Sequence, residues 1–203
     1  MTFDHPELTE ARLPFLESFQ KVCLAGAMTD TLHPNVTEHI AHPPFKASQQ
    51  LADHLQQLHV DLIDLHLQGK QAHWNVVGKN FRDLHLQLDE LVEAARAFSD
   101  QIAERMRAIY VTPDGRAATI AAQTSLAPFP ADEVDTGETV DLITDATYAT
   151  AATARRIHDD VDREDPTTSD ILHEILERLE QLAWMIDSEN RIANRSIPRP
   201  IHE

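Results

Sequence analysis

Apolar residues recur every three or four positions through most of this chain, which is the spacing of a helix with one buried face. The spacing predicts a first long helix over residues 46–75 and a second over residues 80–109. A third is expected to begin at Thr136 or Glu138, and a fourth after Pro166. The inner-face positions of the four helices are Leu51, Leu55, Leu58, Leu62 and Leu65; Leu84, Leu88, Leu91, Ala95, Phe98, Ile102 and Met106; Val140, Ile143, Thr147, Ala154, Ile157 and Val161; and Ile171, Ile175, Leu179, Leu182 and Ile186. Four such helices predict an all-α bundle.

The connection between the second and third helices is long and rich in proline and glycine. A short apolar helix is expected within it, at residues 118–124. A link of this length suits a crossover that leaves the second and third helices parallel. Asn80 is a candidate N-cap for the second helix. Thr167 and Asp170 have the spacing of a capping box at the start of the fourth.

The sequence divides into three parts. Residues 1–45 contain five prolines and are predicted to form an N-terminal extension outside the bundle, with a candidate short helix at residues 15–28. Residues 46–190 form the predicted bundle domain, and residues 191–203 a C-terminal tail.

Composition agrees with a helical protein, because only 5 of the 203 residues are glycine and aromatic residues are few. Cys23 is the single cysteine, which excludes an internal disulfide and fits a reducing compartment. The acidic beginning of the sequence has no basic segment before an apolar core, so we expect no secretory signal. No apolar stretch is long enough to cross a bilayer. We therefore expect a cytoplasmic protein without a membrane partner, with association with the nucleoid as the alternative.

Four potential metal ligands share one face of the second predicted helix, namely His85, Asp89, Asp100 and Glu104. At ~100° per residue they fall at roughly 0°, 40°, 60° and 100° around the helix axis. Along the axis, however, His85 and Asp100 stand about 22 Å apart. The ligands of one ion lie within about 2.0 to 2.6 Å of it. One chain therefore cannot use all four residues for one ion.

Two antiparallel copies of this helix would remove the difficulty. Residue i then faces residue j wherever the two numbers have a constant sum, which pairs His85 with Glu104 and Asp89 with Asp100. The crossing point falls at the alanines of residues 94–95, whose small side chains would permit a close approach. A twofold contact of this kind generates two identical metal sites per dimer.

A solvated acidic face is the alternative explanation of this stripe. Asp100 and Glu104 are like charges one turn apart, which costs an isolated helix about 0.2 to 0.5 kcal/mol unless a cation offsets it. Arg96, one turn earlier, supplies part of such an offset. His73 favours the metal site, because a tight helix hairpin places it close to His85. Imidazole and carboxylate ligands together suit iron or zinc better than calcium or magnesium.

The ligand region also resembles a known family signature. It reads QAHWNVVGKNFRDLHLQLDE and continues with SDQIAER, which is similar to the signature of Dps proteins, the mini-ferritins first named as DNA-binding proteins from starved cells. The resemblance covers residues 46–190 and implies a ferritin-like four-helix bundle, a hollow dodecamer and ferroxidase centres between subunits. Position by position, it implies that one subunit supplies His73 and His85. The twofold mate would supply Asp100 and Glu104.

The resemblance implies further roles for individual residues. Asp89 matches a carboxylate at a second, weaker iron position. Trp74 matches an aromatic residue beside the centre that passes electrons to the oxidant, although packing alone equally explains a tryptophan there. Asp165 and Asp170 lie in a region that adjoins a threefold channel in Dps cages, so we expect them to line the pore through which Fe²⁺ enters. A ring of carboxylates there would raise the local Fe²⁺ concentration.

Two other features bear on the type of metal site. Larger ferritins build their di-iron centre inside one bundle with Glu-x-x-His motifs, and this chain contains none. The site between subunits is therefore the ferritin-like option that fits these residues. His54, His59 and His66 are most simply surface or interface histidines, with an additional metal site as the alternative.

The implied function is that of a ferroxidase and iron store. Fe²⁺ would be oxidised at the centres, with hydrogen peroxide as the oxidant, and stored as ferric mineral, which limits oxidative stress; zinc is a candidate substitute ion. A net charge of −17 argues against electrostatic binding to DNA. One alternative is a DNA-coating nucleoid protein with secondary metal binding. The other is a store of zinc or another divalent metal without redox turnover.

Overall fold

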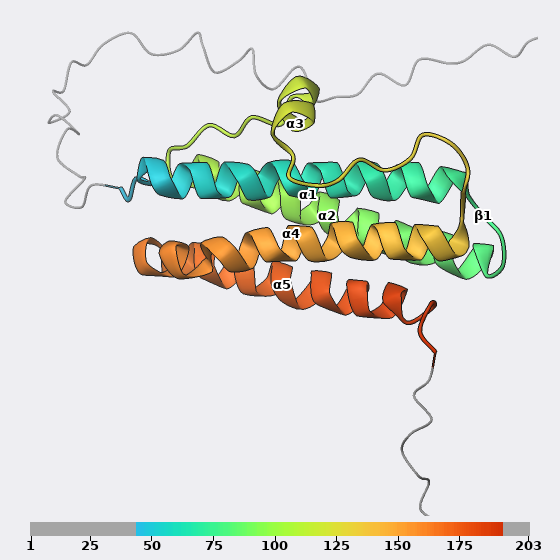
Figure 1. The fold of residues 1–203 in the computed structure, drawn as a ribbon. Helices are drawn as coiled ribbons and strands as arrows, with labels where there is room; N and C mark the ends of the chain where they lie inside the picture. Colours follow the sequence, from blue (N-terminus) through green and yellow to red (C-terminus); the bar gives the residue numbers. More distant parts are fainter. Residues whose placement is uncertain (1–43, 193–203) are drawn as a thin grey trace, which may run out of the picture. The chain divides into compact units, whose positions relative to one another are not determined.

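A computed structural model describes residues 44–192 of the protein. This part of the chain contains five helices and two short strands (Figure 1). They are α1 (Gln49–Asn75), β1 (Val76–Val77), α2 (Phe81–Ala108), α3 (Ala117–Gln123), β2 (Val134–Asp135), α4 (Thr136–Glu164) and α5 (Pro166–Asp187). The predicted extension, its candidate helix at residues 15–28 and the predicted tail lie outside the described residues, apart from residues 44–45 and 191–192.

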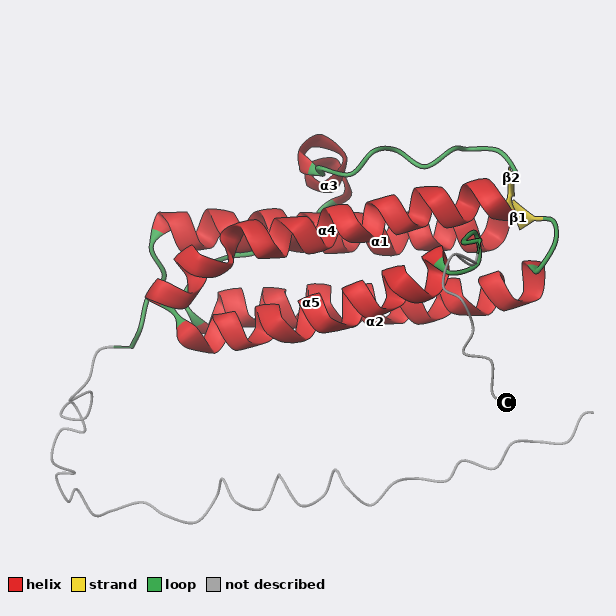
Figure 2. Cartoon of the chain, turned by 60° about the horizontal axis from the view of Figure 1, so that its bottom comes forward, coloured by secondary structure: helices red, strands yellow, loops and turns green. Residues whose placement is uncertain are grey.

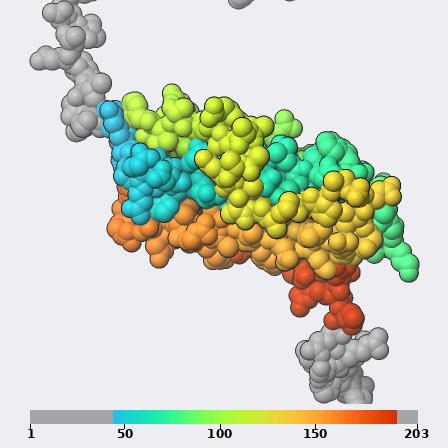
Figure 3. Space-filling model, turned by 45° about the horizontal axis from the view of Figure 1, so that its top comes forward, coloured from blue at the N-terminus to red at the C-terminus, as the bar shows by residue number. Residues whose placement is uncertain are grey.

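The long helices form two antiparallel hairpins, α1 with α2 and α4 with α5 (Figure 1). The connection from α2 to α4 carries α3 and returns along the bundle, so that α2 and α4 run in the same direction, as predicted. At the end of this crossover, β2 pairs in parallel with β1, with Val76 opposite Val134 (Figure 2). The pair holds the start of α4 beside the end of α1. The space-filling view shows the crossover lying against α1 (Figure 3). The predicted all-α, ferritin-like bundle with a short crossover helix is thus confirmed.

The core lies between the four long helices, and the predicted helix faces supply it. Of the predicted inner-face positions, all are buried except Phe98 and Ile171, which are half-buried and pack against the core. Most side chains that the two hairpins bury are leucine, isoleucine, valine or alanine, so burial of apolar surface is the main stabilising contribution. A smaller set of buried polar residues includes Asp61, Asp165 and several threonines. No helix in the described part of the chain is both long enough and apolar enough to cross a membrane.

Two of the predicted helix caps differ in the structure. Asn80 occupies the N-cap position of α2, but it has a left-handed φ of 59° and its side chain makes no capping hydrogen bond. Its amide instead donates to Glu189 at 3.4 Å. The predicted capping box of Thr167 and Asp170 is wrong, because α5 already begins at Pro166. Proline suits this first helical position, since its missing N–H would have no partner inside the helix.

A buried ion pair explains why the α4–α5 connection does not need the predicted capping box. Asp165, the residue between the two helices, is 6% exposed. The guanidinium of Arg105 on α2 donates to both Asp165 carboxylate oxygens, at 2.8 and 2.6 Å from one nitrogen. Arg105 also donates to the hydroxyl of Thr168 at 2.9 Å, and that hydroxyl donates to Asp165. The ion pair therefore fixes the α4–α5 turn to the last turns of α2.

A second buried carboxylate holds the crossover. Asp61 on α1 is fully buried and accepts hydrogen bonds from neutral donors only. Ser125 in the crossover donates through its backbone N–H at 2.9 Å and its hydroxyl at 2.8 Å. Thr153 on α4 and Gln57 on α1 complete the set, at 2.8 and 3.0 Å. One side chain thus connects α1, α4 and the crossover.

We predict that Asp61→Asn lowers the free energy of unfolding by about 1–3 kcal/mol, because the new NH₂ group cannot accept hydrogen bonds from the buried donors. Urea denaturation at matched protein concentration measures the change. Asp53→Asn is the matched control, because Asp53 lies exposed on the same helix and accepts only from Gln49. This control should change stability by less than about 0.5 kcal/mol. Equal effects of the two substitutions would contradict the assigned role of Asp61.

The α1–α2 hairpin has a close contact at Gly69. A Cβ atom at this position would lie 2.8 Å from Val92 Cγ2. We therefore predict that Gly69→Ala destabilises the protein, although alanine is the better helix former by about 1 kcal/mol. Combining it with Val92→Ala should relieve the contact. A double-mutant cycle should then give a favourable coupling of about 0.5–3 kcal/mol between the two substitutions. Additive effects would rule out the contact.

Candidate metal centre

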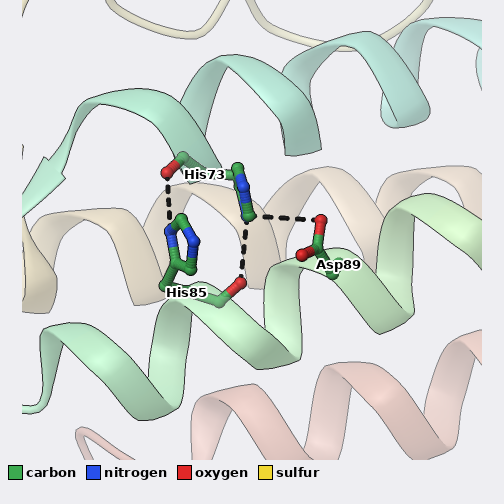
Figure 4. A group of neighbouring side chains, drawn as sticks. All are labelled: His73, His85 and Asp89. Carbon is green, nitrogen blue, oxygen red and sulfur yellow. Dashed lines mark hydrogen bonds and ion pairs between the residues drawn. The ribbon is translucent and has the colours of Figure 1, made fainter.

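His73 and His85 meet where α1 and α2 join, as the sequence predicted. His73 lies in the last turn of α1, and His85 lies in the second turn of α2. Their rings stack, with centroids 3.6 Å apart and planes inclined by 23° (Figure 4). The short connection between the helices permits this approach. It contains Gly78, whose φ of 125° is a conformation that other residues rarely adopt.

The two imidazoles are held by reciprocal hydrogen bonds. His73 Nδ1 donates to the backbone carbonyl of His85, and His85 Nδ1 donates to that of His73, both at 3.0 Å (Figure 4). A carbonyl oxygen can only accept, so both neutral rings must carry their proton on Nδ1. Each Nε2 atom therefore keeps a lone pair. This is the arrangement that neighbouring hydrogen bonds impose on metal-binding histidines.

Asp89 adds a carboxylate one turn after His85. Potential ligand atoms of His73, His85 and Asp89 all lie within 4.8 Å of one another, and they form the one such cluster of three among the described residues. Asp89 Oδ1 lies 3.3 Å from His73 Nδ1 and 2.5 Å from Lys70 Nζ. The hydrogen bond from Lys70 lowers the pKa of Asp89 below its usual value. Asp89 is therefore a carboxylate anion at neutral pH.

Lys70 is the residue of this group that the sequence interpretation missed. It lies one turn before His73 on α1, and this spacing alone would have placed it on the same helix face. Its ammonium group occupies one oxygen of Asp89. The cluster of two imidazoles and one carboxylate therefore offers fewer ligands than the four to six that an iron or zinc ion takes up.

Asp100 and Glu104 lie elsewhere on α2 in the single chain. Both are exposed, and neither belongs to the cluster of His73, His85 and Asp89. Asp100 lies on a groove of about 670 Å³ between α1 and α2, together with His59, His66, Glu93, Arg96 and Ala97. A single subunit thus carries the two predicted halves of the site at separate places.

One detail of the predicted helix crossing is wrong. Ala95 is fully buried in the core of its own subunit, so it is not free to contact another copy, whereas Ala94 is only half-buried. The exposed residues of this part of the stripe are Glu93, Arg96 and Ala97. Pairing residues by their sequence numbers gives the position of the crossing along the axis of α2. It does not determine which side of α2 faces the other copy, and this caused the error.

The remaining predicted site residues occupy different environments. Trp74 is 69% exposed and adjoins His73 in sequence, on a surface shared with Leu67 and Phe129. Asp170 is exposed. Asp165, its expected partner in a pore, is instead buried in the ion pair with Arg105, so its carboxylate is not free to line a channel.

The other histidines of α1 do not form a cluster of three ligands among the described residues. His59 is buried and its Nδ1 donates to the carbonyl of Ser99 at 3.0 Å. Burial lowers the pKa of His59, and also that of His66, so both rings are neutral at pH 7. His54 Nε2 lies 3.5 Å from Asp160 Oδ2 on α4. His54 and His66 are half-buried at the surface, whereas His59, expected at the surface or an interface, is buried within its own subunit.

Comparison with known proteins assigns the family. A family model described as a ferritin-like domain matches residues 52–194. The chain is 36% identical over 135 residues to the DNA protection during starvation protein 2 of Deinococcus radiodurans, covering 65% of this chain and 55% of that protein. It is 31% identical over 161 residues to the fine tangled pili major subunit of Haemophilus ducreyi, covering 79% of this chain and 85% of that subunit.

Solved structures agree with these sequence matches. The crystal structure of Dps92 from Deinococcus radiodurans superposes with a TM-score of 0.67 at 32% identity, covering 68% of this chain and 84% of that one. Dps from Microbacterium arborescens, solved in a high iron form, gives a TM-score of 0.64 at 30% identity, covering 71% and 97%. The helix order, the crossover and the sequence matches all lead to the same assignment: the chain belongs to the Dps family of ferritin-like proteins.

Proposed function

We propose that this protein oxidises Fe²⁺ at sites shared between two subunits and stores the product as ferric mineral inside an oligomeric shell. The cluster of His73, His85 and Asp89 carries this proposal. It presents two imidazole lone pairs beside an ionised carboxylate, a donor set that suits Fe²⁺. Fe²⁺ is the substrate of this reaction.

Asp100 and Glu104 of a twofold mate complete the ligand shell in this proposal. Both carboxylates are exposed on α2 and are available to another copy. The groove beside Asp100 receives the second subunit, and Ala97 supplies the small side chain at the approach. The anionic ligands stabilise Fe³⁺ more than Fe²⁺ because the charge on the ion increases on oxidation. The imidazoles bind the ferrous ion before that step.

Hydrogen peroxide is the proposed oxidant. Two Fe²⁺ ions lose one electron each, and one peroxide molecule takes up both electrons and two protons to give two waters. This stoichiometry consumes peroxide without releasing hydroxyl radicals. Trp74, the residue after His73, is proposed to pass an electron when one iron is oxidised alone.

The shell is proposed to be a dodecamer, which Fe²⁺ enters through acidic pores. Asp170 remains the candidate pore residue because it is exposed. Asp165 is left out of this proposal because Arg105 neutralises it inside the subunit. The domain is proposed to span residues 46–190, with the flanking segments outside the bundle.

DNA coating is the second candidate function, and several relatives are named DNA protection during starvation proteins. The net charge of −17 per chain opposes it, because DNA binding depends on cationic side chains that displace counterions from phosphates. We propose that any protection of DNA comes from removal of Fe²⁺ and peroxide.

A complementation experiment tests whether two subunits share each site. One variant carries His73→Ala and His85→Ala, and the other carries Asp100→Ala and Glu104→Ala. Each alone should lose rapid Fe²⁺ oxidation. In a mixed dimer, one site combines both defects and the other is intact. When equal amounts of the two variants mix at random, half of the dimers are mixed, and each mixed dimer has one intact site of two. About a quarter of the wild-type number of sites should therefore be restored.

The two variants are co-expressed with different tags, and particles that contain both are purified in two steps and checked by native mass spectrometry. Fe²⁺ oxidation is followed by ferric absorbance after anaerobic loading. Particles containing one variant alone are the control and should stay inactive. Mixed particles without recovered activity would reject shared sites.

A further experiment separates iron oxidation from the two alternatives. Anaerobic loading with Fe²⁺ followed by peroxide should give about one peroxide consumed per two Fe²⁺, together with a mineral that remains with the particle. Loading without any ferric absorbance would instead indicate a divalent-metal store. A gel-shift titration across salt concentrations should show no DNA retention at physiological salt. Salt-sensitive retention would favour the DNA-coating function.

A further inference from the structure

A second pair of histidines faces each other across the α4–α5 hairpin. His158 lies near the end of α4, and His173 lies in the second turn of α5. Their Nε2 atoms are 2.8 Å apart, with ring centroids separated by 4.8 Å. We propose that His158 and His173 form a binding site for a divalent first-row transition-metal ion, separate from the candidate centre.

A carboxylate orients His158 for this purpose, and a second carboxylate lies near His173. Asp159 Oδ1 lies 3.0 Å from His158 Nδ1, and an ionised carboxylate can only accept a hydrogen bond. The proton of neutral His158 is therefore on Nδ1, and the lone pair is on Nε2. Asp170 Oδ1 lies 3.9 Å from His173 Nδ1, too far for a hydrogen bond. When no ion is bound, His173 Nε2 therefore carries the proton and donates to His158 Nε2 at 2.8 Å. Carboxylates behind imidazole ligands are typical of metal sites.

The separation of the two nitrogen atoms indicates the class of ion. With metal–nitrogen bonds of about 2.0–2.1 Å, nitrogens 2.8 Å apart subtend an angle of about 85° at the ion. This angle matches neighbouring positions of an octahedron and is smaller than the tetrahedral angle. Imidazole nitrogen suits nickel, copper, iron or zinc and does not suit calcium or magnesium.

The surroundings of the pair leave room for the remaining ligands. The His173 side chain is 58% exposed and that of His158 is 26% exposed, so water can fill the outward coordination positions. The hydroxyl of Ser169 lies 3.2 Å from His158 Nε2 and donates to its lone pair when no ion is bound. Ion binding requires a rotation of this hydroxyl and a shift of the His173 proton from Nε2 to Nδ1, the nitrogen that faces Asp170.

The proposed site is remote from the candidate centre in the same subunit. The candidate centre lies at the α1–α2 connection, at one end of the bundle, and the α4–α5 connection lies at the other end (Figure 1). None of His158, His173, Asp159 and Asp170 belongs to the cluster at the candidate centre. A substitution in one site can therefore be made without changing a residue of the other, and metal binding at the two sites can be measured separately.

Isothermal titration of the tag-free, full-length protein with Ni²⁺ tests the proposal. The wild-type protein should bind one more Ni²⁺ per chain than the variant with His158→Ala and His173→Ala. His54→Ala is the matched control, because this half-buried histidine also lies beside an aspartate on the bundle surface. It should keep the wild-type stoichiometry. An unchanged stoichiometry in the double variant, or an equal loss in the control, would overturn the proposal.

A second measurement distinguishes a metal site from a loss of folding. Asp159→Asn should weaken Ni²⁺ binding at this site by about 10-fold, because it removes the carboxylate behind His158. Its circular dichroism spectrum and its rate of Fe²⁺ oxidation should stay at the wild-type values. In a background that carries His73→Ala and His85→Ala, bound Cu²⁺ should give an electron paramagnetic resonance spectrum with two equivalent nitrogen ligands, which the further substitutions His158→Ala and His173→Ala should remove. Identical Cu²⁺ spectra in both proteins would also overturn the proposal.

Discussion

The candidate centre depends on one exchange of hydrogen bonds, in which His73 and His85 each donate to the backbone carbonyl of the other. Because both carbonyls belong to helices, the orientation of the rings is as rigid as the backbone of the hairpin. The same bonds fix the protonated nitrogen and leave Nε2 for a metal. Asp89 is held nearby as an anion by Lys70. The fold thus brings two imidazoles and a carboxylate together in one chain, and in the proposed site the rest of the shell comes from another subunit.

The sequence was sufficient for the architecture because the helices bury regular faces. Leucines at three- and four-residue spacing predicted α1 and α2 to within a few residues, and Pro166 located the start of α5. The length of the crossover predicted its direction. The approach of His73 to His85 was also predictable, since only a short turn separates their helices. These features depend on local periodicity and connection length, both of which can be read from the sequence.

Other features depend on contacts between distant segments, which periodicity does not contain. Asp165 looked like one member of an acidic surface run, but Arg105, sixty residues away, makes it a buried ion-pair partner. Ala95 looked like a contact residue for another copy, yet it faces the core of its own subunit. The hydrogen bond of Lys70 to Asp89 likewise required α1 and α2 to be placed side by side. The pairing of His85 with Glu104 across a dimer remains a prediction, since it concerns a second chain.

The buried carboxylate of Asp61 has a consequence for how the molecule opens. The groups that donate hydrogen bonds to it belong to α1, α4 and the crossover, and all of them are neutral. If the crossover detached alone, the carboxylate would lose two of its four donors while remaining enclosed by the helices. Such an intermediate is costly, so fraying of the crossover should be coupled to separation of α1 from α4. Amide hydrogens in both regions should then exchange with solvent as one cooperative unit.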